Sequence, residues 1–233
     1  MPPRLLVGAV FGVSPLAERF ERAGHTVRAL DIDNDPGAIA HVDLVLLDGP
    51  SAEIRTACET LADHARPRQM FLHTALDEGQ QLLDDVETAQ AITMCAHNIF
   101  DNVWVTSAAD ELGETVVGLL ITEIGGVSLR INDDARPVIA ASQELRALES
   151  VIRDDAQAIL AEAVPGFDAV AQQFFQAPPA PRRAHDTQQL DQLVQALPDR
   201  GVRRLFVDLV RRRGEVEQDT DTELWVIQKY EGA

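Results

Sequence analysis

The N-terminal sequence runs RLLVGAV (Arg4–Val10), SPLAERFERAG (Ser14–Gly24) and HTVRALD (His25–Asp31). The first run is a short apolar stretch typical of a buried strand, and the third is a second strand that ends on an acid. Between them, Ser14 stands at an N-cap position, Pro15 at the first helical position and Gly24 just after the last turn. The stretch therefore predicts a β-α-β unit that opens an α/β fold.

The loop between this first strand and helix departs from the dinucleotide-binding pattern. That pattern is G-x-G-x-x-G, followed roughly 20 residues later by an acid for the ribose hydroxyls. Gly8 takes the first glycine position, but Val10 and Val13 take the second and third, with Gly12 between them. Asp31 stands where the ribose acid belongs. The valines add bulk at the pyrophosphate and at the helix–strand contact, so the sequence favours the fold while the cofactor loop is degenerate.

Strands and helices continue to alternate up to residue 133. The predicted strands are Val42–Pro50, Arg68–Thr74, Ala89–Asn98, Asn102–Ala108 and Gly126–Asp133. The predicted helices are Ser51–Ala65, capped by Ser51, and Ala109–Gly125, with apolar residues at 112, 116, 119, 120 and 124. This alternation predicts a mostly parallel sheet with helices on both faces.

From Ala135 onward the pattern is helical only. The expected helices are Ala135–Val164 (one helix or two), Pro165–Ala177, Thr187–Leu197, Val202–Gln218 and Thr220–Glu231, with a proline-rich linker at Pro178–Asp186. Two domains are predicted: residues 1–133 form an α/β dinucleotide-binding domain, and residues 134–233 form a helical domain. We expect the helical half to make a homodimer, because its apolar set exceeds what about 100 residues bury alone. That set is Phe167, Phe174, Phe175, Phe206 and Trp225.

Composition excludes several classes of protein. The net charge of −18 argues against nucleic acid or an anionic membrane as partner. Lys229 is the single lysine, so there is no GK[ST] phosphate loop and no internal lysine for acid–base or Schiff-base chemistry. Cys58 and Cys95 are expected to be buried, reduced thiols. The apolar run Leu5–Ala17 lacks the basic leader and cleavage site of a secretory signal, and no run reaches the ~18 residues of a membrane span, so a cytoplasmic protein is expected.

The order of these segments resembles the 6-phosphogluconate-dehydrogenase-like superfamily, in which a Rossmann domain precedes an all-helical domain. The similarity is to its uncharacterised Rossmann-like dehydrogenases, neighbours of pyrroline-5-carboxylate reductase and prephenate dehydrogenase. It is carried by VGAV…LAERFERAGHTVRALD, VDLVLLDGPSAEI, FLHTAL, MCAHN and ADELGETVVGLLITEIGG followed by DARPVIAAS. The resemblance covers about residues 4–160, and beyond them it rests on helical content. It implies a Rossmann-like fold with a ligand crevice at the carboxyl ends of the strands.

The resemblance also implies roles for individual residues. Those facing the pyrophosphate would be Gly8, Ala9, Val10, Phe11 and Gly12. Asp31 would accept from the adenosine ribose, and Asp48, Gly49 and Pro50 would line the nicotinamide side. His73 and His97 end neighbouring strands and would converge on the crevice as candidates for proton transfer. His97-Asn98 departs from the His-Pro pair common in related sequences, and the superfamily's catalytic lysine has no counterpart in Ala135–Ala177.

Each role has a plainer alternative. Gly8 and Gly12 could shape a turn, Gly49-Pro50 could be turn chemistry before a helix, and Asp31 could be a solvated acid. Both histidines could be hydrogen-bonded structural residues. The basic run Val202–Arg213 could be a solvated helix face or could cross a dimer interface or guide an anionic ligand. No H-x-x-x-H or C-x-x-C spacing exists, so no metal site is predicted.

The sequence thus favours an NAD(P)-dependent dehydrogenase or reductase that acts on a small anionic metabolite, with His97 or His73 as the proton-transfer residue. NAD is favoured over NADP because Asp31 would repel a 2′-phosphate. The alternative is a non-catalytic Rossmann-like binding or regulatory protein that has lost cofactor use. Val10, Val13 and the missing lysine favour the alternative, whereas Asp31 and the two histidines favour the enzyme.

Overall fold

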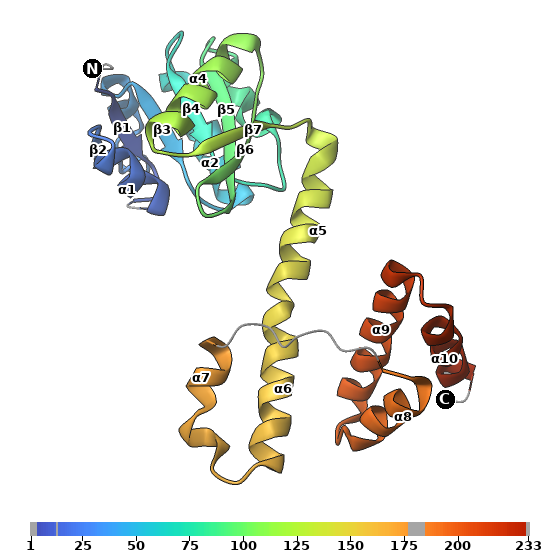
Figure 1. Cartoon of the computed structure of the whole chain (residues 1–233). Coiled ribbons are helices and arrows are strands. Elements are labelled where there is room, and N and C mark those ends of the chain that lie inside the picture. The colour runs from blue at the N-terminus through green and yellow to red at the C-terminus, as the bar shows by residue number, and fades with distance from the viewer. Residues whose placement is uncertain (1–3, 13, 177–184, 232–233) are drawn as a thin grey trace. The chain divides into compact units, whose positions relative to one another are not determined.

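The computed structural model describes residues 4–12, 14–176 and 185–231. The chain forms two compact units, Met1–Leu145 and Arg146–Ala233. The described strands all lie in the first unit, and the second is helical (Figure 1). The predicted fold class, a Rossmann-like sheet followed by a helical region, is confirmed. The predicted domain boundary after residue 133 stays a prediction. Val13 and most of the predicted linker lie outside the described residues.

A seven-stranded sheet forms the centre of the first unit, in the order β2-β1-β3-β4-β5-β6-β7. The strands are β1 (Leu6–Ala9), β2 (Thr26–Ala29), β3 (Leu44–Leu47), β4 (Met70–His73), β5 (Ile92–Phe100), β6 (Val103–Ala108) and β7 (Val127–Arg130). Neighbours pair in parallel except β5 and β6, which are antiparallel. Because β2 and β3 flank β1 on opposite sides, the strand order reverses at β1, and ligands of open α/β sheets bind beside such a point.

Helices cover both faces of this sheet. They are α1 (Pro15–Arg22), α2 (Ser51–Leu61), α3 (Asp84–Glu87) and α4 (Glu111–Glu123), with 3-10 turns at Pro36–His41, Ala62–His64, Gln80–Leu83 and Asp133–Ala135. On one face, Phe20 of α1 and Ile121 of α4 share a core with the strands. On the other, Ile54 of α2 and Val86 of α3 do the same. Burial of these apolar stripes holds the strand ends in fixed positions.

The predicted start of α1 is confirmed. Ser14 has extended backbone and its Oγ accepts a hydrogen bond from the Ala17 amide at 3.2 Å, and Pro15 begins the helix. Gly24, at φ +97°, ends the turn that leads to β2. The sequence predicts both ends of this helix because capping depends on residues that are neighbours in the chain.

Three expectations about the first unit are corrected. Ser51 does not cap α2: Pro50 is the N-cap residue, and the Ser51 hydroxyl donates to Asp77 at 2.6 Å instead. The buried face of α4 is Gly113, Val117, Leu120 and Ile121, whereas Leu112 and Leu119 are exposed. His97 is not at a strand end, because β5 runs on to Phe100 as a hairpin with β6. The Ser51 hydroxyl is taken by Asp77, packing against the sheet selects the buried face of α4, and pairing with β6 extends β5 past His97.

Helix α5 (Arg136–Ala147) follows β7 and is succeeded by α6 (Glu149–Ala163), so of the two alternatives for Ala135–Val164 the structure has two helices. The rest of the second unit is a 3-10 turn at Phe167–Ala169 and the helices α7 (Ala171–Gln176), α8 (Thr187–Ala196), α9 (Arg200–Glu217) and α10 (Thr220–Glu231). A small core joins α8, α9 and α10 around Leu190, Val207 and Trp225. The Trp225 indole is further held by a 2.8 Å hydrogen bond to Asp191.

The last three arginines of the basic run, Arg211–Arg213, pair within α9. Arg211 and Arg212 both contact Glu215, at 3.0 and 3.1 Å, and Arg213 reaches Glu217 at 3.9 Å. This geometry favours the solvated helix face over a role in binding an anion, because exposed i,i+3 and i,i+4 pairs are ordinary surface features.

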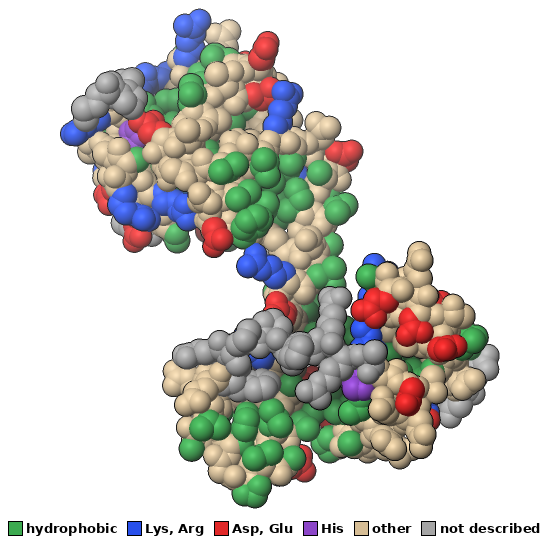
Figure 2. Space-filling model, viewed as in Figure 1, with side chains coloured by type: hydrophobic (Ala, Val, Ile, Leu, Met, Phe, Trp, Pro, Cys, Tyr) green, Lys and Arg blue, Asp and Glu red, His purple; other side chains and the backbone are tan. Residues whose placement is uncertain are grey.

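Apolar side chains are also exposed on the first unit. Figure 2 shows hydrophobic side chains gathered over β6 and β7, and Val127 and Leu129 of β7 are about half exposed. Among the described helices, none combines the length and the apolar character needed to span a bilayer.

Candidate functional site

The carboxyl ends of β1 and β3 meet where the strand order reverses. Phe11 follows β1 and Gly49 follows β3, and the Phe11 ring lies so close to Gly49 that an added Cβ there would approach Cδ2 to 2.8 Å. A glycine is therefore needed at position 49 for this contact. Phe11 and Asp48 each line a separate cavity at this edge of the sheet.

The first cavity lies at the end of β2 and has a volume of about 480 Å³. Its lining combines Val10, Phe11, Leu30 and Ile32 with residues of α2. Three carboxylates, Asp31, Asp33 and Glu53, also line it. No Lys or Arg is among its described lining residues. The cavity is therefore apolar at its wall and acidic at its rim.

Asp31 is held in a fixed turn. Its carboxylate accepts from the Asn34 side-chain amide at 2.8 Å and from the Asn34 backbone amide at 3.3 Å. These hydrogen bonds lower the pKa of Asp31, because they stabilise its charged form. Asp31 is thus an ionised acceptor at the position that the sequence assigned to the ribose acid.

The other residues predicted to face the pyrophosphate are spread over different environments. Gly8 lies inside β1, where a Cβ would collide with Leu30 and approach Val42 to 3.2 Å, so its role there is close packing. Ala9 and Val10 are buried in opposite cores of the sheet. Gly12, at φ +83°, has open space around it. Among these residues, the structure brings Val10 and Phe11 to the first cavity.

The second cavity, of about 200 Å³, lies beyond the carboxyl ends of β3 and β4 and beside the β5–β6 hairpin. It is lined by Pro15, Leu16, Asp48, Thr74, His97, Asn98 and Trp104. The Thr74 hydroxyl donates to Asp48 at 2.6 Å, and the Thr74 carbonyl lies 2.8 Å from His97 Nδ1. Asp48 and His97 therefore share one cavity, as expected from their positions in the sequence, and Thr74 links them. Pro50 is exposed at the start of α2 and does not line it.

His73 lies elsewhere, in the core. Its side chain is fully buried, Nε2 lies 3.0 Å from the Gly79 carbonyl, and Nδ1 has no partner among the described residues. Burial, reinforced by the charge of Arg136, lowers the pKa of His73 to about 4. His73 is therefore a neutral ring shielded from ligands, and His97 is the better placed of the two histidines for proton transfer.

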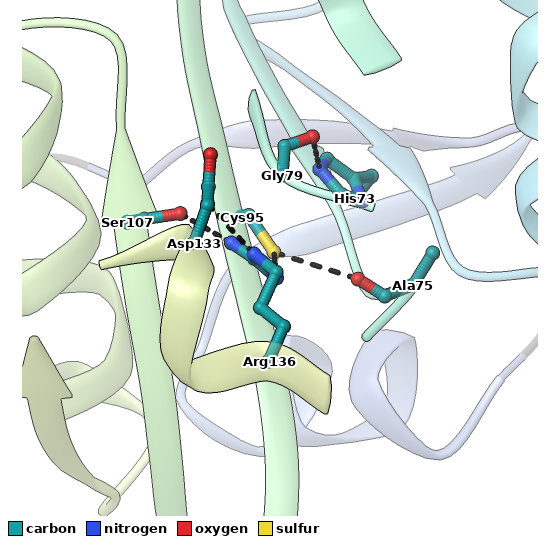
Figure 3. Close-up of polar contacts among 7 residues, drawn as sticks. All are labelled: His73, Ala75, Gly79, Cys95, Ser107, Asp133 and Arg136. Atoms are coloured by element: carbon teal, nitrogen blue, oxygen red, sulfur yellow. Dashed lines mark hydrogen bonds and ion pairs between the residues drawn. The ribbon is translucent and has the colours of Figure 1, made fainter. Parts of the chain in front are cut away.

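A buried polar cluster adjoins His73 (Figure 3). His73, Cys95 and Ser107 are cross-strand neighbours on β4, β5 and β6. The Arg136 guanidinium, at the start of α5, donates to Ser107 at 2.5 Å, to Asp133 at 2.8 Å and to Cys95 Sγ at 3.4 Å. These contacts satisfy a buried arginine and fix the beginning of α5 on the sheet.

The two cysteines are free and buried, as the sequence indicates. Burial raises the pKa of Cys58 to about 12 and also raises that of Cys95, so both stay thiols at neutral pH. Among the described residues, no group of three or more His, Cys, Asp or Glu side chains could hold a metal ion.

Sequence reasoning missed Thr74, Arg136 and Gln143. Thr74 follows His73 directly, so its strand-end position was available as a signal. Gln143 lies within 3.3 Å of His97 Nε2, although the two are far apart in the sequence. Arg136 and Gln143 stand seven residues apart on one helix face, but nothing in the sequence says which strand that face meets.

Comparison with known proteins supports the fold described above. Residues 132–229 match the family described as 6-phosphogluconate dehydrogenase C-terminal domain-like. No curated protein matches the chain. The match covers the helical region, where sequence patterns alone were least informative, and confirms the resemblance to this superfamily there.

Solved structures match over nearly the whole chain. An imine reductase from Pseudomonas sp. has a TM-score of 0.62 at 10% identity, over 94% of this chain and 96% of that one. Pyrroline carboxylate reductase from Plasmodium falciparum, with NADP bound, has a TM-score of 0.57 at 8% identity, over 98% and 97%. Prephenate dehydrogenase from A. aeolicus, in complex with hydroxyphenyl propionate and NAD+, has a TM-score of 0.50 at 14% identity, over 100% and 94%. At these identities the likeness establishes the fold.

Proposed function

We propose that this protein is an NAD-dependent dehydrogenase or reductase acting on a small anionic metabolite. The observation that carries the proposal is the pair of cavities near the carboxyl ends of the parallel strands, one lined by Phe11 and Asp31 and one lined by Asp48 and His97. They lie at the sheet edge where open α/β folds bind nucleotides. Two of the similar structures named above contain NADP or NAD+, which supports the same cofactor class.

The nucleoside half of a dinucleotide fits the first cavity. Leu30 and Ile32 offer an apolar wall for the adenine, and Asp31 is an ionised acceptor for ribose hydroxyls. Asp33 and Glu53 add negative charge at the same rim. A 2′-phosphate would meet these carboxylates with no described lining cation to offset them, so NAD is favoured over NADP.

The nicotinamide supplies hydride transfer when it is bound, and this chain supplies the proton. The His97 imidazole lines the second cavity, where it could give or take a proton at a bound substrate, and Asp48, held by Thr74, would orient polar groups beside it. A cavity of about 200 Å³ suits a small substrate. Protonated His97 is the one cationic group among the described lining residues, so it would face the substrate's negative charge.

One observation favours the alternative, a binding or regulatory protein that has lost cofactor use. The Phe11 ring lines the first cavity and packs against Gly49, next to Asp48 of the second cavity, so a dinucleotide that occupies both cavities would have to pass this ring. The cofactor would have to displace this ring. A cytoplasmic location and a homodimer belong to the same proposal; the free thiols Cys58 and Cys95 fit a reducing compartment.

Direct titration with NADH and NADPH, followed by nicotinamide fluorescence, tests the cofactor. We expect NADH to bind at least about tenfold more tightly than NADPH. Repulsion between the 2′-phosphate of NADPH and the nearby carboxylates should weaken binding by at least that factor. ADP-ribose should compete with NADH, because it occupies the nucleoside half alone. Absence of binding by either reduced cofactor would reject the enzyme and favour the binding protein.

A second assay tests the chemistry. NADH would be mixed with small keto acids and cyclic imino acids, and NAD+ with hydroxy acids, and nicotinamide absorbance would be followed. His97→Gln should lower turnover roughly 100-fold while leaving NADH affinity unchanged, because proton transfer typically contributes that much. The matched control is His41→Gln, which alters an exposed histidine outside both cavities. Equal turnover in the two variants would remove His97 from the mechanism.

A further inference from the structure

Helix α5 contacts β5 at two points, both within the first unit. At its start Arg136 bonds Cys95, and two turns later Gln143 bonds His97 and the Asn98 carbonyl. Residues seven apart lie on the same helix face, so the two side chains reach the same strand. The buried Arg136 fixes the start of α5 on the sheet. This position of the helix places the Gln143 side chain beside the His97 imidazole.

The hydrogen bonds determine which ring nitrogen of His97 carries the proton. Nδ1 lies 2.8 Å from the Thr74 carbonyl, which can only accept, so Nδ1 is the protonated nitrogen. In the neutral ring Nε2 then has a bare lone pair. It lies 3.2 Å from Gln143 Nε2, and that same amide nitrogen lies 3.4 Å from the Asn98 carbonyl. Both contacts agree with Gln143 donating to His97.

The other end of the same amide suits the protonated ring. Gln143 Oε1 lies 3.3 Å from His97 Nε2 and can accept from the imidazolium N–H. The Gln143 amide therefore offers a donor to the neutral His97 ring and an acceptor to the protonated ring. Neither hydrogen bond requires a large movement of the Gln143 side chain. Asp48 is the other titratable side chain that lines this cavity among the described residues, and it is engaged by Thr74.

We propose that Gln143 is a positioning residue that occupies His97 Nε2 in the free protein and yields this nitrogen to the substrate. This inference rests on the proposed function. In the oxidative direction the substrate O–H or N–H bond breaks and its proton moves to the Nε2 lone pair. The electron pair of the adjacent C–H bond leaves as hydride to the nicotinamide cofactor, and a C=O or C=N bond forms. The new Nε2–H is then stabilised by Gln143 Oε1.

Two substitutions at position 143 separate this role from simple packing. Gln143→Glu presents only acceptors, so it favours the doubly protonated ring; Gln143→Leu removes both partners at similar volume. The control is Ser142→Glu, which adds the same charge to an exposed neighbouring position on a different face of α5. The readout is nitrogen-15 NMR of the ring of His97, assigned with His97→Gln among the six histidines.

In the wild-type protein we expect the neutral ring to carry its proton on Nδ1. In Gln143→Glu the doubly protonated ring should persist to higher pH, by about one pH unit or more, as expected for a carboxylate within hydrogen-bond distance. Ser142→Glu should leave the titration unchanged. An identical titration in Gln143→Glu and Ser142→Glu would overturn the inference, as would a wild-type neutral ring protonated on Nε2.

Activity gives an independent comparison. Gln143→Leu should lower turnover about tenfold with NADH affinity unchanged, which is the size of effect expected for one lost hydrogen bond to a reacting group. Gln143→Glu should shift the pH profile of substrate oxidation to higher pH, because Nε2 must lose its proton first. Unchanged turnover and pH profile in both variants would overturn the positioning role. Failure of the proposed function is distinguishable, since it would appear as wild-type protein that binds neither NADH nor NADPH.

Discussion

His73 and His97 show how two similar residues acquire different chemistry. Both follow apolar runs in neighbouring strands, and in the sequence they are equal candidates. In the structure His73 lies under the segment around Gly79 and is fully buried, whereas His97 is partly exposed in a cavity with Asp48. The difference comes from the length of β5, which carries His97 beyond the end of β4.

The burial of His73 predicts how stability depends on pH. Its pKa is about 4 in the folded protein, against 6.5 for an ordinary histidine, so only the unfolded chain takes up this proton between those values. The free energy of unfolding should therefore fall as pH drops from 6.5 towards 4, by up to about 1.4 kcal/mol per pH unit. Urea unfolding of His73→Asn should show a shallower dependence than wild type. His41→Asn, at an exposed histidine, should keep the wild-type slope, and equal slopes in all three would contradict the prediction.

The position and charge of Asp31 lead to a prediction about the preference for NADH over NADPH. Asp31→Asn removes the charge but keeps the size of the side chain. NADH affinity should fall about tenfold, since a hydrogen bond to a charged group contributes roughly 1.5–3 kcal/mol, while the preference for NADH over NADPH narrows. Fluorescence titration with both cofactors measures this. Asp35→Asn is the control, because Asp35 is exposed nearby and does not line the cavity. A fall of equal size in the control would remove Asp31 from the site.

At the scale of elements, the β1–α1 loop decides whether the two cavities can serve one ligand. The sequence directed attention to Val10 and Val13 as excess bulk. Val10 instead belongs to the buried core beside Ile32 and Leu47, so exchanging it for glycine would cost stability. Phe11, in this loop, packs against Gly49 at the end of the neighbouring parallel strand β3.

We therefore predict that Phe11→Ala strengthens NADH binding, because it opens the passage between the nucleoside and nicotinamide cavities. Gly49→Ala should do the reverse, since its Cβ would press on the ring at 2.8 Å. An affinity difference of about tenfold or more between the variants is expected from one displaced aromatic side chain. Fluorescence titration measures it, with circular dichroism to show that both variants are folded. Equal affinities would mean that the ligand does not cross at Phe11.

At the scale of the whole molecule, exposed apolar side chains indicate self-association. Val138 and Leu145 of α5 are 71% and 72% exposed, and Leu148, Val151 and Ile152 beside and on α6 are also exposed. The set named from the sequence was partly wrong for this purpose: Trp225 is buried in the core of α8, α9 and α10. The Phe174 and Phe175 side chains lie outside the described residues.

We predict a homodimer in which the helices after β7 form most of the interface, since exposed apolar groups of this extent rarely face water in a monomer. Light scattering at micromolar concentration should give twice the chain mass. Val138→Glu combined with Leu145→Glu should give the monomer mass, whereas Leu119→Glu, at an exposed position of α4, should not. A monomeric wild-type protein, or dissociation by the α4 variant alone, would contradict this arrangement.

The sequence by itself determined the order of strands and helices, the capping of α1 and the position of Asp31, because these depend on periodicity and on neighbours a few residues apart. It also predicted that Asp48 and His97 meet at one edge of the sheet, although His97 reaches that edge because β5 extends beyond the end of β4 and not because its strand ends there.

Only the tertiary structure decided which histidine is accessible, which face of α4 is buried and where α5 docks. Those outcomes depend on packing between segments distant in the sequence, which a local pattern leaves undetermined. The contact of Gln143 with His97, across 46 positions of the chain, is of this kind. It exists because Arg136 finds a buried partner set on β5 and β6, and no local pattern encodes that pairing.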